Sequence, residues 1–171
     1  MVAALMIANL AVRGPSTPAQ LGLSHPLRGA APILLSGAIL CGVILLMGST
    51  VRFAGAGHGL PWDRSWQYLI WALAQEFILQ SIFYVRLEMI FAPRHASLIA
   101  AGLFSLAHIP SPVLTLLSFV GGFFFSWLFG RFRNLYALGA IHGALGLTIA
   151  SCLPDAWLHH MRVGLGYLTH S

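Results

Sequence analysis

Residues 71 to 81 read WALAQEFILQS, and they place one carboxylate, Glu76, in the middle of an apolar run that is long enough to cross a bilayer. A charged acid at the bilayer centre costs about 2.5 to 3.5 kcal/mol even on a lenient scale, so such residues usually face a protein interior or a water-filled cavity. An acid in this place could merely pair with a neighbouring helix. The sequence favours the functional interpretation, in which Glu76 takes part in chemistry.

The composition predicts an integral membrane protein. Of the 171 residues, 58% are hydrophobic and only 8% are charged, whereas about a quarter of the residues of an ordinary globular domain are charged. The net charge of +5 comes from arginines at the ends of apolar runs, and these do not form the continuous basic face that nucleic acid requires. We therefore expect the lipid bilayer, and no nucleic acid, as a partner.

The apolar runs predict an all-α fold, a polytopic transmembrane helical bundle with about five to six spans. Five runs are clear: Pro32 to Val51, Trp66 to Val85, a third from about Ala96 through His108, Val113 to Phe129, and Leu135 to Leu153. We expect three regions. Residues 1–31 form an N-terminal apolar or interfacial segment and loop, residues 32–153 the transmembrane core, and residues 154–171 a C-terminal tail.

The distribution of arginine predicts the orientation in the membrane. If the N-terminus is cytoplasmic, the loops on that side hold Arg13, Arg28, Arg86, Arg94, Arg131 and Arg133, and those on the other side hold Arg52, Arg64 and Arg162. Cytoplasmic loops carry the excess of basic residues, so we expect the N-terminus inside.

Two histidines accompany Glu76 within the predicted spans, and each of the three residues lies on a different helix. His108 and His142 could meet Glu76 at a common site, where a desolvated carboxylate is a usable general base for water. An imidazole could then orient that water or stabilise the oxyanion of an attacked carbonyl. The alternative is a zinc ion held by all three residues with an open fourth position. We favour the version without a cofactor.

The order of these residues resembles the CPBP family of intramembrane proteases, which includes CAAX-prenyl endopeptidases and bacteriocin-processing enzymes. Phe104 to His108 matches the second family motif, Phe-x-x-x-His, in full, and His142 begins the third motif but lacks its closing Asn. The resemblance covers about residues 66 to 153. It implies a glutamic-type peptide hydrolase with Glu76, His108 and His142 as catalytic residues and Phe104 in support.

The first motif of the family, Glu-Glu-x-x-x-Arg, is altered here. Gln75 stands in place of the leading Glu and Gln80 in place of the Arg. An amide does not take up a proton, so either Glu76 serves as the base, supported by Gln75 and Gln80, or the chain is a catalytically silent membrane scaffold. Gln80 lies four residues from Glu76, within hydrogen-bonding reach on a helix. A small carrier with Glu76 as its proton site is a third possibility.

The resemblance also implies a partner and a location. Some bacterial members resemble sorting-signal proteases of the myxosortase kind, which trim C-terminal membrane anchors from exported proteins. We therefore expect a membrane-anchored protein substrate with a C-terminal hydrophobic sorting signal, and a place in the bacterial cytoplasmic (inner) membrane.

Overall fold

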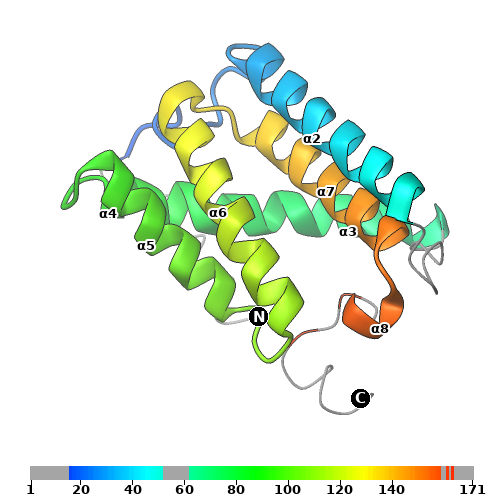
Figure 1. The fold of residues 1–171 in the computed structure, drawn as a ribbon. Helices are drawn as coiled ribbons and strands as arrows, with labels where there is room; N and C mark the ends of the chain where they lie inside the picture. The colour runs from blue at the N-terminus through cyan, green and yellow to red at the C-terminus, as the bar shows by residue number, and fades with distance from the viewer. Residues whose placement is uncertain (1–15, 52–61, 159–160, 162, 164–171) are drawn as a thin grey trace.

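The computed structural model describes residues 16–51, 62–158, 161 and 163. Within these ranges every regular element is a helix, so the predicted all-α class is confirmed (Figure 1). The elements are α2 (Ala30–Val51), α3 (Trp62–Glu76), η1 (Phe77–Tyr84), α4 (Val85–Leu87), α5 (Pro93–Leu106), α6 (Pro112–Phe132), α7 (Leu135–Cys152) and α8 (Asp155–Leu158). The first 15 residues of the predicted N-terminal segment and most of the predicted tail lie outside this description.

Four helical stretches in the described ranges are long and apolar enough to cross a membrane. They are Ala30–Val51, Ser65–Leu87, Pro112–Phe132 and Leu135–Cys152, and the second of them runs through α3, η1 and α4. The third predicted span corresponds to α5, whose 14 residues fall short of the ~20 that cross a bilayer alone. The four stretches together with α5 agree roughly with the five to six spans expected.

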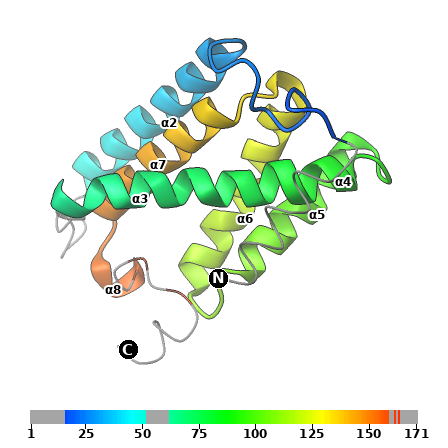
Figure 2. The same cartoon turned by 180° about the vertical axis from the view of Figure 1, so that it is seen from behind.

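The helices pack as two pairs that are joined by a long crossing helix. α2 lies along α7, α5 lies along α6, and α3 with η1 runs behind both pairs (Figures 1 and 2). α6 and α7 touch much less than the members of either pair do. The two pairs are therefore joined mainly by α3 and η1, and little by direct contact between α6 and α7.

Local sequence signals fix where two of these helices begin. Pro112 stands at the first positions of α6, behind Ser111, whose side-chain oxygen accepts from the Leu114 backbone N–H. Asn134 caps α7 in the same way, by accepting from the Ala137 N–H at 3.0 Å.

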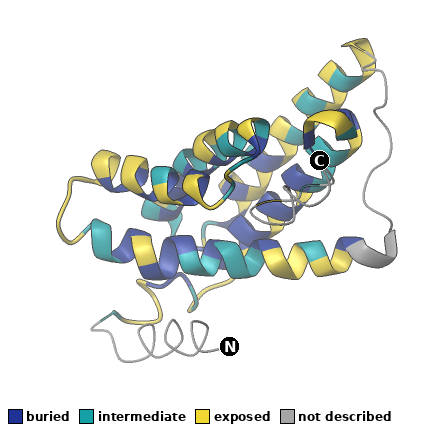
Figure 3. Ribbon diagram, turned by 90° about the horizontal axis from the view of Figure 1, so that it is seen from below, coloured by how far each residue is buried: buried dark blue, intermediate teal, exposed yellow. Residues whose placement is uncertain are grey.

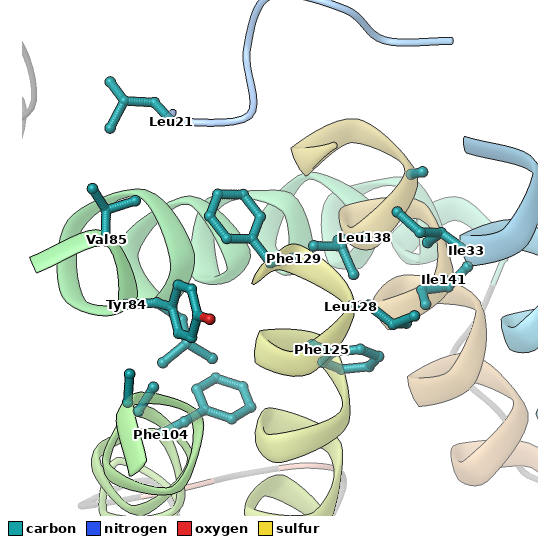
Figure 4. Packing of buried hydrophobic residues seen from close by; sticks show 14 of the residues in the cluster. Leu21, Ile33, Tyr84, Val85, Phe104, Phe125, Leu128, Phe129, Leu138 and Ile141 are labelled. Atoms are coloured by element: carbon teal, nitrogen blue, oxygen red, sulfur yellow. The ribbon is translucent and has the colours of Figure 1, made fainter. Parts of the chain in front are cut away.

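Aromatic side chains fill the core on the inner side of the bundle. Figure 4 shows Tyr84, Phe104, Phe125 and Phe129 in this buried cluster, to which three helices contribute them. Tyr84 and Phe129 meet edge to face, with ring centroids 5.9 Å apart, an arrangement that aromatic pairs prefer. Exposed residues line the outward faces of the helices (Figure 3), and many of them are large and apolar. A lipid-facing surface has this character.

The described part of the N-terminal region packs across one end of the bundle. Ser81 donates to the Leu21 carbonyl oxygen at 2.8 Å, and the Leu135 N–H donates to that of Gly22 at 3.1 Å. Gly22 has a φ of 76°, and a Cβ there would lie 2.7 Å from the Phe129 ring. The segment 16–29 is thus tied to the helices at several points.

Candidate active site

A change in helix type follows Glu76 directly. α3 ends at Glu76, and the eight residues from Phe77 to Tyr84 continue as a π-helix before the chain returns to α-helix at Val85. π-helical turns inside α-helices are rare and occur frequently at functional sites. The π-helix lies in the second half of the span, where Gln80 and Ser81 are fully buried.

The Glu76 carboxylate is fully buried and each of its oxygens has a partner. His142 Nδ1 lies 2.9 Å from Oε1, and Gln80 Nε2 donates to Oε2 at 3.0 Å. The side chain of Glu76 has 0% exposure and that of His142 11%. A buried carboxylate needs such partners, because an unpaired one would carry the full cost of desolvation. The pair joins α3 to α7 within the apolar part of the bundle.

Small residues on α7 allow this approach. A Cβ at Gly139 would lie 2.6 Å from the Leu73 side chain, and one at Gly143 would lie 2.4 Å from that of Leu69. The Leu73 Cα would lie 3.0 Å from a Cβ at Gly139, so α3 crosses α7 most closely at that glycine, whereas at Gly143 the Leu69 side chain would have to move. The spacing of four residues between the two glycines is a signal in the sequence that could have predicted this contact.

His142 is held in place by aromatic rings as well. It stacks on Phe125, with centroids 5.2 Å apart, and meets the edge of Phe104 at 5.7 Å. Phe104 also packs edge to face on His108 at 4.7 Å. One phenylalanine thus touches both histidines, which gives the predicted Phe-x-x-x-His motif a geometric reason.

The hydrogen bonds of the two histidines decide which ring nitrogen remains for other partners. A carbonyl oxygen can only accept, so His108 donates from Nδ1 to the Phe104 carbonyl oxygen, 2.8 Å away. An ionised Glu76 can likewise only accept, so His142 donates to it from Nδ1. In each neutral imidazole, Nε2 then carries the lone pair. Both neutral histidines therefore offer an acceptor at Nε2.

Both histidines line a cavity of about 700 Å³ between the two helix pairs. Gln75 and Phe104 line it too, and most of the remaining wall is apolar, with residues such as Leu40, Leu117 and Phe124. Glu76 lies behind His142 and is not among the lining residues. The structure thus brings Glu76, Gln80 and His142 into one hydrogen-bonded group, and His108, Phe104 and Gln75 onto the same cavity.

The zinc alternative can be compared with the positions of its three proposed ligands. Among the side chains that the structure describes, no three His, Cys, Asp or Glu residues lie close enough together to hold a metal ion. Glu76 presents its oxygens to His142 Nδ1 and Gln80. The residues in this arrangement do not fit a zinc site made by Glu76, His108 and His142.

Comparison with known proteins assigns the chain to a family. A family model described as Rce1-like, type II CAAX prenyl endopeptidase, matches residues 57–148, which is more than half of the chain and includes all the motif residues. No curated protein and no solved structure matches the chain. The resemblance that the motifs predicted is thereby confirmed, and it supports an intramembrane endopeptidase. The chain belongs to the Rce1-like family of type II CAAX prenyl endopeptidases.

Proposed function

We propose that this protein hydrolyses a peptide bond near the membrane-anchored C-terminal segment of a protein substrate, with Glu76 and His142 together as the proton acceptor. The observation that carries the proposal is the buried hydrogen bond between Glu76 and His142 at the wall of a cavity that His108 also lines. An acid that orients an imidazole is the arrangement by which hydrolases make a histidine a general base. Glu76 then acts through the imidazole.

The reaction follows from the two Nε2 acceptors. A water molecule gives one hydrogen bond to His142 and the other to His108, and its oxygen attacks the carbonyl carbon of the substrate. The proton moves to His142 Nε2, and Glu76 stabilises the imidazolium that forms. His142 then gives this proton to the amide nitrogen as the carbon–nitrogen bond breaks. The products are a carboxylic acid and an amine.

The oxyanion of the tetrahedral intermediate needs a hydrogen-bond donor. The neutral histidines offer acceptors, whereas the Gln75 side chain has an NH₂ group and lines the same cavity. We assign Gln75 this role, which accounts for an amide where the family motif has an acid. A donor that is aimed at the developing charge is worth about 10²- to 10³-fold in rate.

The cavity suits a substrate that remains in the membrane. Its wall is mainly apolar and lies between helices whose outer faces carry exposed apolar side chains. An apolar C-terminal anchor could enter without leaving a low-dielectric environment. The proposed location is the bacterial inner membrane, with the arginine-rich end of the bundle, which holds Arg28, Arg131 and Arg133, on the cytoplasmic side.

Replacement of His108 tests the proposal directly. In vesicles that contain the full chain and a protein with a C-terminal hydrophobic anchor, we expect cleavage by the wild type and loss of cleavage with His108→Ala, because the attacking water loses an acceptor. Mass spectrometry of the products measures cleavage, and co-purification measures substrate binding, which should persist. If neither the wild type nor His108→Ala cleaves the substrate and both bind it equally, the scaffold alternative is favoured. Gln75 in place of the leading Glu of the family motif is the feature that points to this alternative.

Independence from a metal is expected. Chelation of divalent cations should leave the rate of cleavage unchanged within about twofold, because the two histidines and Glu76 supply the proton acceptor without a Lewis acid. The measurement is the initial rate before and after dialysis against a chelator. A loss of activity that zinc restores would require a different site.

Filling the cavity should weaken substrate binding. A Cβ at Gly121 would meet only the Phe125 ring, at 3.5 Å, and Gly121 lines the cavity. Gly121→Leu is therefore expected to fold and to raise KM about tenfold, because its side chain takes the place of substrate atoms. Gly102→Leu is the matched control, since a Cβ at Gly102 meets nothing within 4 Å and the residue lies outside the cavity. An equal KM for both variants would show that the substrate binds elsewhere.

A further inference from the structure

A second cavity lies at the end of the bundle, away from the candidate active site. It has a volume of about 260 Å³ and lies between the N-terminal segment 16–29 and the turn from α6 to α7. The polar residues that line it are Ser24, His25, Arg28, Arg131 and Arg133. Three guanidinium groups and one imidazole around so small a space are an arrangement that suits an anion.

The fold holds this cavity in shape. Asn134 is fully buried, and its Nδ2 donates to the carbonyl oxygens of Pro26, at 2.7 Å, and Arg28, at 3.0 Å. The N-terminal segment is thereby fixed next to the end of α6. Arg133 holds it from the other side by donating to the Gln20 carbonyl oxygen at 3.3 Å. The backbone around the cavity is thus determined by hydrogen bonds from two adjacent residues.

The arginines of the cavity carry more positive charge than the described carboxylates neutralise. Arg133 forms an ion pair with Glu88, but none of the described carboxylates forms an ion pair with Arg28 or Arg131. Both of these arginines are exposed at the rim. Two uncompensated charges that face one concave surface raise the local concentration of anions.

Exposed apolar side chains near the cavity indicate where the anion comes from. Leu27, in the segment that forms the cavity wall, is 88% exposed. Met89 and Ile90, next to the Glu88 that pairs with Arg133, are 69% and 76% exposed. Exposed apolar side chains beside a basic cavity are typical of a protein surface that lies at the boundary between the lipid head groups and the acyl chains of a bilayer.

We propose that the cavity formed by Arg28, Arg131 and Arg133 binds the phosphate group of an anionic membrane lipid. The lipid phosphate bridges the N-terminal segment to the turn between α6 and α7, while its chains lie beside Leu27. Basic pockets among transmembrane helices recognise lipid head groups by this chemistry. A bound lipid therefore stabilises the docked N-terminal segment.

The test compares lipid binding by the full chain and by matched variants. Binding of phosphatidylglycerol is measured by native mass spectrometry and by the melting temperature in mixed micelles, with phosphatidylcholine as the neutral reference. We expect phosphatidylglycerol to raise the melting temperature of the wild type, and Arg28→Gln with Arg131→Gln to weaken its binding about 10- to 100-fold. Arg94→Gln is the control, because Arg94 lies exposed in the first turn of α5 and does not line the cavity.

Several results would overturn the proposal. One is equal binding of phosphatidylglycerol by the wild type and the double variant, and another is an equally large loss in Arg94→Gln, which would indicate general surface attraction. A rise in melting temperature with inorganic phosphate, but not with phosphatidylglycerol, would assign the site to a free anion. Should the double variant fail to fold, Arg131→Lys replaces it. Lysine keeps the positive charge but lacks the two parallel N–H donors of the guanidinium group, so we expect weaker binding of phosphatidylglycerol. Unchanged binding would count against the proposal.

Discussion

Glu76→Gln is expected to lower kcat/KM for peptide hydrolysis by about 10²- to 10⁴-fold, which is the range for loss of a general base or of the acid that orients it. The substitution keeps the size of the side chain and its place beside Gln80. It removes the negative charge that stabilises a protonated His142. An amide N–H turned toward His142 Nδ1 would also require that nitrogen to accept, which leaves Nε2 protonated and unable to take a proton from water. The measurement is the initial rate of cleavage in vesicles at substrate concentrations below KM, which reports kcat/KM.

The control for this experiment is the other carboxylate near the end of the same span. Glu88→Gln also removes one acid, but Glu88 pairs with Arg133, and neither residue lines the cavity that the two histidines line. It should retain kcat/KM within a few-fold and lose some thermal stability, because a partly buried arginine is left with fewer partners. If Glu76→Gln keeps the wild-type rate, the proton acceptor is not the pair of Glu76 and His142, and the proposed chemistry fails.

The sequence predicts the helical class and the residues at the site better than their mutual geometry. One acid in an apolar run and two histidines on other spans suffice to predict a common site, because ionisable groups are costly in lipid. The sequence could not predict that Glu76 would face His142 from behind the cavity while Gln75 lines it. Adjacent residues on an α-helix point about 100° apart, so the division of labour between them depends on which face α3 turns toward α7.

The π-helix and the basic cavity show two further limits. Nothing in the residues from Phe77 to Tyr84 distinguishes a π-helix from an α-helix, since its apolar pattern suits either and tertiary packing selects one. The cavity brings Arg28 within reach of Arg131, about a hundred positions further along the chain. The sequence predicted only that these arginines lie on the same side of the membrane. Their arrangement around one cavity depends on how the N-terminal segment folds.

Asn134→Ala is expected to lower the free energy of unfolding by about 2 to 5 kcal/mol, from the loss of an N-cap and of donors to buried carbonyl groups. The side chain caps α7 through Oδ1 and holds the N-terminal segment through Nδ2. No water can replace it easily, because Asn134 is fully buried. Denaturant titration in detergent micelles, followed by circular dichroism, measures the change. Proteolysis between residues 16 and 29 should accelerate as well, since that segment loses its anchor.

Two variants separate the roles of the Asn134 side chain. Ser111→Ala removes only an N-cap, that of α6, and should cost about 1 kcal/mol. Asn134→Asp keeps an acceptor for the Ala137 N–H but replaces the donor with an oxygen that faces the carbonyls of Pro26 and Arg28. Because like partial charges then oppose one another, we expect a loss of stability at least as large as that of Asn134→Ala. If the aspartate variant is as stable as the wild type, the N-cap alone accounts for the contribution of Asn134 to stability. The N-terminal segment must then be held by Ser81 and Arg133 instead.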